Sequence, residues 1–212
     1  YPNGNTRTNY TIPDSVKTIA FYAFKNSASL TNVTIGNSVK TIDDYAFYDC
    51  INLTSIIIPD STTTIGNYAF YGCESLTSVT IPDSITKICN SAFSGCTSLE
   101  KIILPTTLQM IESKAFMNCS SLKSIVIPYS VGSFDNSCNK WVFRDCIQLE
   151  DVYIINKYWT PGTSNAFKGC QNITLHAVEG ASIQKMVKHS QFVVKKEKEK
   201  KKKKKNIEVG DM

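Results

Sequence analysis

Residues 53–75 read LTSIIIPDSTTTIGNYAFYGCES, and variants of this stretch follow one another along most of the chain. An Ala-Phe pair occurs five times at a spacing of 23 residues, and two looser copies follow, at 23–24, 46–47, 69–70, 92–93, 115–116, 142–143 (as Val-Phe) and 166–167. In most copies a Cys follows the Phe by three residues and a Leu follows it by six. Self-similarity at a short fixed period is typical of solenoid proteins, whose units stack on one another.

Each unit contains one predicted strand and one return segment. Ile56 and Ile58 share one phase of a two-residue alternation, which is typical of a half-buried strand. Pro59 has no backbone N–H and therefore ends the ladder. The return segment carries an isolated Ile65 and then the Ala-Phe pair, which we expect to point inward. Because so short a unit cannot bury its apolar side alone, equivalent residues should stack about 4.8 Å apart, with the Phe residues in one column.

Composition and charge exclude several classes of protein. Of the 212 residues 42% are hydrophobic, which is too apolar for a disordered chain. No apolar run approaches the roughly 18 residues that a membrane-spanning helix needs. The net charge of +5 lies in residues 195–212, with nine Lys and four acidic residues, so the neutral remainder predicts no basic nucleic-acid face. The sequence begins at Tyr1 without a leader, and any targeting signal is expected to have been cleaved or to lie outside it.

The unit L-x-x-I-x-I-P-x-x-x-x-x-I-x-x-x-A-F-x-x-C resembles the BspA-type leucine-rich repeat over about residues 9–194. This resemblance implies an α/β repeat solenoid: a right-handed, strand-rich coil of about seven units, with short turns or helical turns bearing the Ala-Phe pairs. Residues 172–194 are similar to the C-terminal cap of such arrays, with a strand at 174–176, a helix at 181–189 and a closing strand at 192–194. Residues 1–194 should form one domain with a degenerate first strand, and residues 195–212 a disordered Lys-rich tail.

Eight cysteines raise the question of a metal or disulfide site, but six of them occupy one column of the repeat, at 50, 73, 96, 119, 146 and 170. Thiols spaced by one coil lie in a line, whereas the ligands of a zinc site converge on one point. Parallel side chains also disfavour a disulfide between neighbours. We therefore expect six buried, reduced thiols and no metal or other cofactor. Cys89 and Cys138 fall outside the column and are expected to be exposed.

The sequence contains no recognisable catalytic motif. Its two histidines, His176 and His189, fall in the predicted cap and lie in no nucleophile elbow, zincin helix or phosphate-binding glycine loop. Histidines in such a cap are expected to face solvent. The chain is therefore predicted to be no enzyme and to have no small-molecule substrate.

The outward positions of the predicted strands form two columns, which we call the strand face. One column contains Asn32, Ser55, Ser78, Lys101, Ser124 and Asp151, and the other Thr34, Ile57, Thr80, Ile103, Val126 and Tyr153. The early half is rich in Ser and Thr, whereas the later half mixes charged with aliphatic residues. The predicted ligand-binding residues are Lys101, Ile103, Lys123, Val126, Asp151 and Tyr153. The alternative is drift on a solvated surface, because β-branched residues suit strands in any case.

Two units are longer than the rest, and both tryptophans of the chain lie in them. The spacing from Phe116 to Phe143 is 27 residues, with extra residues around 135–141, and the next unit contains the segment 158–162. Insertions in a solenoid form surface loops. Trp141 and Trp159 are therefore candidate loop contacts for a partner, and the alternative is that each fills the space left by a lengthened turn.

Two classes of function fit these features. The resemblance implies a non-catalytic protein-binding or adhesion module, at the cell surface or secreted, whose partner is a host-cell protein, a matrix protein or another repeat protein. Five Asn-x-Ser/Thr sequons agree with this class, although about three are expected by chance in such a sequence. The alternative is an intracellular, cytoplasmic scaffold whose Lys-rich tail binds polyanions such as nucleic acid or an anionic membrane.

Overall fold

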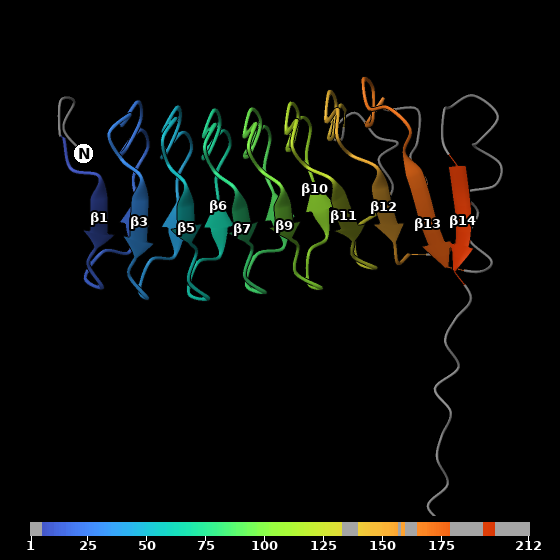
Figure 1. The fold of residues 1–212 in the computed structure, drawn as a ribbon. Coiled ribbons are helices and arrows are strands. Elements are labelled where there is room, and N and C mark those ends of the chain that lie inside the picture. Colours follow the sequence, from blue (N-terminus) through green and yellow to red (C-terminus); the bar gives the residue numbers. More distant parts are fainter. Residues whose placement is uncertain (1–5, 133–139, 157, 160–164, 179–192, 198–212) are drawn as a thin grey trace, which may run out of the picture.

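The computed structural model describes residues 6–132, 140–156, 158–159, 165–178 and 193–197, with the backbone alone for 178 and 193–197. These residues form a row of stacked coils in sequence order, from β1 at one end to β14 at the other (Figure 1). The architecture is a strand-rich parallel β-solenoid of about seven turns, as the 23-residue period predicts.

The strand face is built from two parallel sheets that continue one another along the row (Figure 1). The first has the order β1-β3-β5-β7-β9, with β1 (Asn9–Ile12), β3 (Asn32–Ile35), β5 (Ser55–Ile57), β7 (Ser78–Thr80) and β9 (Lys101–Ile103). The second has the order β11-β12-β13-β14, with β11 (Ser124–Ile127), β12 (Asp151–Ile154), β13 (Thr174–Val178) and β14 (Val193–Glu197). Equivalent repeat positions pair directly, as Asn9 with Asn32 and Val126 with Tyr153 do.

The return segments contribute a second set of short strands. They form a three-stranded sheet, β2-β4-β6, and a two-stranded one, β8-β10. The bounds are β2 (Thr18–Ile19), β4 (Thr41–Ile42), β6 (Thr64–Ile65), β8 (Lys87–Ile88) and β10 (Met110–Ile111). Their isolated Ile residues are buried, as the sequence predicts.

The Ala-Phe segments are turns, and the described residues contain no helix, so none there could cross a membrane. In the second coil, Tyr45 and Asp49 have positive φ values of 57° and 53°. The N–H of Phe47 donates to the carbonyl of Ala69 in the next coil (2.7 Å), whereas the N–H of Tyr48 bonds within its own turn. Within a helix, by contrast, each N–H beyond the first turn donates to the carbonyl four residues earlier in the same segment. The alternating turn instead joins neighbouring coils, which is why the expected α/β character is not found.

A column of phenylalanines runs through the core, as predicted. Successive rings from Phe24 to Phe167 are stacked, with centroids 4.8–5.8 Å apart and interplanar angles of 4–11°. Every ring in the column is buried. At the first coil, Tyr10 packs edge-on against Phe24 with the centroids 5.4 Å apart.

The cysteine column is buried and its six thiols are free, as predicted. Each thiol donates to the carbonyl of the Phe in the preceding coil; for example, Cys50 Sγ lies 3.0 Å from the Phe24 oxygen. Burial raises the pKa of Cys96 to about 12. The prediction for Cys89 is wrong, because its side chain is only 7% exposed. Cys138 lies outside the described residues.

The two ends differ from the sequence prediction in detail. The first strand is regular: β1 pairs with β3 over four residues, and Tyr10 replaces the aliphatic residue at the inward position. At the other end, β13 and β14 lie where two strands were expected and pair in parallel, but β14 continues to Glu197, three residues beyond the expected end, and the cap as a whole is not confirmed. The expected helix at 181–189, His189 and most of the Lys-rich tail lie outside the described residues.

Candidate functional site

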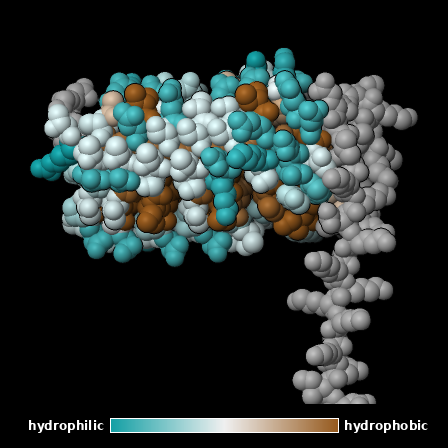
Figure 2. Space-filling model, viewed as in Figure 1, coloured by the Kyte–Doolittle hydropathy of each residue, from teal (hydrophilic) through white to brown (hydrophobic). Residues whose placement is uncertain are grey.

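The later half of the strand face gathers the predicted ligand-binding residues on neighbouring strands. Ile103 on β9, Val126 on β11 and Tyr153 on β12 point outward and are 47%, 48% and 38% exposed. Val126 and Tyr153 are direct partners in the ladder. Figure 2 shows hydrophobic patches along this side of the molecule, interrupted by pale and hydrophilic surface. The three residues form an apolar row across adjacent coils.

Charged residues border this row. Lys101 begins β9 and is exposed. Lys123 precedes β11, and its Nζ lies 3.7 Å from Glu100 Oε2. Both side chains of that ion pair are well exposed to solvent, so the pair contributes little to stability. These lysines therefore remain accessible to a partner.

At the end of the row, Asp151 and Tyr153 contact His176 of β13. Asp151 Oδ1 accepts a hydrogen bond of 2.6 Å from His176 Nε2. The Tyr153 ring is stacked on the imidazole with centroids 4.3 Å apart. His176 is buried, contrary to the expectation that it faces solvent. It occupies the same register as Tyr153 on the next strand, which is a position the repeat alignment could have indicated.

Three further exposed apolar residues lie near this half of the face, and sequence reasoning missed them. Ile155 follows β12, while Tyr129 and Tyr158 lie in the turns that follow β11 and β12. Two of them break the repeat pattern. Ile155 takes the place of the Pro that ends earlier strands, and Tyr129 takes the place of the residue after that Pro, which is Asp60 in an earlier unit. Loss of a turn residue in favour of an exposed apolar one is a signal that could have found them.

The structure separates the two tryptophans. Trp159 is fully buried and packs edge-on toward Phe167, so it fills space inside a lengthened turn and is not available as a loop contact. Trp141 is half-buried and holds the same register position as Tyr68, with φ of 60°. Lys114 Nζ and Arg144 Cζ each lie 5.3 Å from its ring centroid. Trp141 thus belongs to the regular turn and is engaged by two cations.

The early half of the strand face is mostly polar and internally bonded; its strongly exposed apolar residue is Ile57 on β5, at 75%. Asn32 Nδ2 donates to Asn9 Oδ1 (2.8 Å), and Ser55 Oγ donates to Asn32 Oδ1 (2.9 Å). Thr31 and Thr54 each donate a side-chain hydrogen bond to the backbone of the preceding coil. Because these polar groups already have hydrogen-bond partners within the chain, they would gain little free energy from contact with a partner protein.

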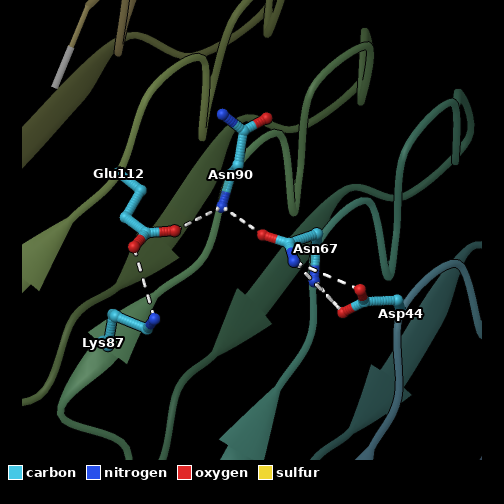
Figure 3. Close-up of polar contacts among 5 residues, drawn as sticks. All are labelled: Asp44, Asn67, Lys87, Asn90 and Glu112. Atoms are coloured by element: carbon cyan, nitrogen blue, oxygen red, sulfur yellow. Dashed lines mark hydrogen bonds and ion pairs between the residues drawn. The ribbon is translucent and has the colours of Figure 1, made fainter. Parts of the chain in front are cut away.

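A second polar ladder crosses the return segments of four coils (Figure 3). Asp44 Oδ1 accepts from the N–H of Asn67 (2.6 Å), and Asn67 Oδ1 accepts from the N–H of Asn90 (3.2 Å). Glu112 accepts from the same N–H and forms an ion pair of 3.3 Å with Lys87. Since these groups satisfy one another, the ladder joins coils; the described residues contain no cluster able to hold a metal ion.

A cluster of exposed and half-exposed aromatic residues covers the Ala-Phe turns of the first three coils. We call it the turn-edge cluster; it consists of Phe21, Tyr22, Tyr45, Tyr48, Tyr68 and Tyr71. Tyr45 is stacked on Tyr68 at 4.8 Å, and Tyr48 on Tyr71 at 4.9 Å. The repeated letters YAF and YAFY carry this cluster in the sequence.

The repeat signature of the BspA-type leucine-rich repeat region matches residues 3–79 and 63–190, in six copies. With this match and the fold described above, the chain belongs to the BspA-type leucine-rich repeat family. No curated protein matches the sequence.

Several solved structures share the fold. A leucine-rich repeat protein of T. pallidum is 25% identical, with a TM-score of 0.65 over 82% of this chain and 75% of its own. A leucine-rich cell surface protein of Faecalibacterium prausnitzii is 25% identical, with a TM-score of 0.62 over 88% of this chain and 56% of its own. The pneumococcal vaccine antigen PcpA, 18% identical, has a TM-score of 0.52 over 93% of this chain and 43% of its own, and shows the fold alone.

Proposed function

We propose that the chain is a non-catalytic protein-binding module, displayed at a cell surface or secreted, and that its partner docks on the later half of the strand face. The observation that carries the proposal is the apolar row of Ile103, Val126 and Tyr153 on three neighbouring strands. A similar fold in a protein described as a cell surface protein supports the location.

The geometry suits protein recognition for a physical reason. Side chains on a hydrogen-bonded parallel sheet are already ordered, so binding costs little conformational entropy. An exposed Tyr among aliphatic residues, with lysines at the border, has the composition of an interface centre and its rim. Adjacent coils together offer the roughly 800 Å² per partner that a specific complex buries. A host-cell or matrix protein with an apolar centre and acidic border would complement this face.

The proposal can be tested with a matched pair of variants. The first combines Ile103→Glu with Tyr153→Ala, and the second combines Ile57→Glu with Thr34→Ala at the same registers in the early half. Binding of the labelled chain to intact host cells and to immobilised matrix proteins should fall at least about tenfold for the first pair and less than about twofold for the second. Circular dichroism should show both variants folded.

Two results would overturn the proposal. Equal losses in both pairs would mean that the whole face, or none of it, is the contact. Binding that survives both pairs but disappears on raising the salt concentration would favour the alternative, a polyanion-binding scaffold that uses the Lys-rich tail. Labelling of intact cells against fractionated cytosol would then decide the compartment.

A further inference from the structure

Charge is distributed unevenly along the solenoid. Residues 1–100 contain five basic and eight acidic residues, whereas residues 101–212 contain 18 basic and 10 acidic ones. Because the coils are stacked in sequence order (Figure 1), the acidic excess lies in the first coils, whereas most of the basic excess belongs to residues 195–212, which hold nine Lys and four acidic residues. Opposite ends of two molecules therefore attract each other over about a Debye length.

The turn-edge cluster lies at the acidic end and is bordered by carboxylates. Phe21 and Tyr22 are 52% and 41% exposed, which is high for two adjacent aromatic residues in contact with each other. Asp49 follows Tyr48 in the same turn; burial raises its pKa, the nearby Glu74 carboxylate raises it further, and Lys25 opposes the shift. An additional cation nearby would stabilise the ionised form of the Asp49 carboxylate.

The rings of the cluster already accept an ammonium group within the chain. Lys25 Nζ lies 4.3 Å from the centroid of Tyr22 and 5.3 Å from that of Tyr48. These distances are those of cation–π contacts. The cluster thus combines aromatic faces and carboxylates that both favour lysine side chains.

The aromatic residues are not required by the backbone. Tyr22, Tyr45 and Tyr68 have positive φ, a conformation that bulky residues rarely adopt. At the equivalent position of later coils, Ser91, Lys114, Trp141 and Asn165 adopt the same φ, so the turn accepts residues of several kinds. Tyrosine at these turns therefore needs an explanation beyond coil geometry.

We propose that the Lys-rich segment 198–205 of a second copy of this chain binds the turn-edge cluster, so that copies associate head to tail. This segment contains seven Lys and one Glu. Its ammonium groups would bind to the exposed ring faces and to Asp49 and Glu74. Because the two contacting surfaces differ, the association is heterologous and produces chains of molecules unless the arrangement closes into a ring.

The segment of the same molecule can at most bring its last residues to the near edge of the cluster, so it cannot cover the site. Six strand spacings separate β5, which follows the middle turn of the cluster, from β14. At about 4.8 Å each they amount to about 29 Å along the row, before the sideways distance from strand to turn is added. Residues 198–205 follow the end of β14 at Glu197 and extend at most about 28 Å. A second copy is not subject to this limit.

The test uses the full chain and a labelled synthetic peptide of residues 195–206. Sedimentation velocity at about 50 mM salt should show concentration-dependent association, which about 500 mM salt should reverse. Fluorescence anisotropy should show the peptide binding to the chain with an affinity that falls at least about tenfold over the same range.

Matched variants locate the contact. Asp49→Asn with Glu74→Gln should weaken peptide binding at least about tenfold. Asp60→Asn with Asp83→Asn removes the same charge from exposed turns that follow the Pro residues and should change it less than about twofold. Tyr22→Asn, which keeps a residue suited to positive φ, should also weaken binding at least about threefold.

Three results would overturn the proposal. One is a full chain that stays monomeric at low salt and high protein concentration. Another is an equal loss of peptide binding in the two acidic pairs, which would mean that the overall field and not the cluster attracts the peptide. The third is undiminished association of a chain in which Lys200 to Lys205 are replaced by Ser.

Discussion

The early and later halves of the strand face share one backbone register and one core, yet they present different chemistry. In the early half Asn32 and Ser55 are hydrogen-bonded to one another along the row, and the exposed apolar residue Ile57 lies between polar neighbours. In the later half Ile103, Val126 and Tyr153 expose apolar surface on three neighbouring strands. A polar group that already has its partners gains little from a ligand, while exposed apolar area gains from burial. The comparison shows that the backbone geometry of a repeat protein can stay constant while the surface chemistry of one half differs from that of the other.

The largest expected effect concerns the core that both halves share. Phe70 is fully buried between Phe47 and Phe93, and Phe70→Ala should lower the free energy of unfolding by about 3–5 kcal/mol. Phe24→Ala should cost less, because Phe24 stacks on only one ring of the column. Urea unfolding measures both. Equal losses would mean that the column is not a continuous core.

The second effect is the pH dependence of the free energy of unfolding, to which buried cysteines of both halves should contribute. Burial raises the pKa of Cys50 in the early half and of Cys170 in the later half to about 12, from an ordinary value near 9. The folded state thus holds these protons more tightly than the unfolded state. Stability should be constant below about pH 8 and fall as the pH rises from about 9 toward 12.

Thiol labelling at about pH 8 checks the same burial. We expect the column cysteines and Cys89 to react with a thiol reagent only after unfolding. Replacement of Cys89 by Ser should leave the native labelling unchanged. Rapid native labelling of any column cysteine, or a disulfide between Cys73 and Cys96 in mass spectrometry, would contradict the assignment.

A smaller effect tests the polar ladder of the early half. Asn32→Ala removes a donor to Asn9 and an acceptor for Ser55, and should cost about 0.5–1.5 kcal/mol. Ser124→Ala, an exposed residue in the same column of the later half, should change stability by less than about 0.5 kcal/mol. Chemical denaturation compares the two. Similar values would remove the distinction between the halves.

The smallest effect concerns the C-terminal tail. Removal of residues 198–212, after the end of β14, should change the melting temperature of dilute protein at high salt by no more than about two degrees. A segment dominated by Lys buries too little apolar area to offset the entropy of ordering. A larger drop would mean that the tail packs against the solenoid.

Most of the fold could be predicted from the sequence because the same pattern of apolar, turn and strand residues occurs in every unit. The 23-residue spacing predicts the stacking of Phe24 through Phe167 and the burial of the cysteine column, since any residue kept at one register meets its own copy in the next coil. The strand face followed from the two-residue alternation for the same reason. The predicted site residues could be placed on that face, although the sequence left their binding untested.

Departures from the repeat were predicted less well. Cys89 and His176 are buried where exposure was expected, and of the two alternatives for Trp159 the structure shows the one in which the ring fills a lengthened turn. Their surroundings depend on the length of a neighbouring turn or on a residue more than twenty positions away, such as Asp151 for His176. A periodic pattern contains no information on such single contacts.

The sequence by itself determined the solenoid, its period, its columns and the order in which chemistry changes along its axis, because hydrophobic periodicity is a local property of the chain. Only the tertiary structure decided how the coils are joined. Each turn contains positive-φ residues such as Tyr45 and Asp49, and every second N–H reaches the next coil, as that of Phe47 does with Ala69. A helix and such a turn bury the same side chains, and the choice between them depends on hydrogen bonds that exist only when a neighbouring coil is present.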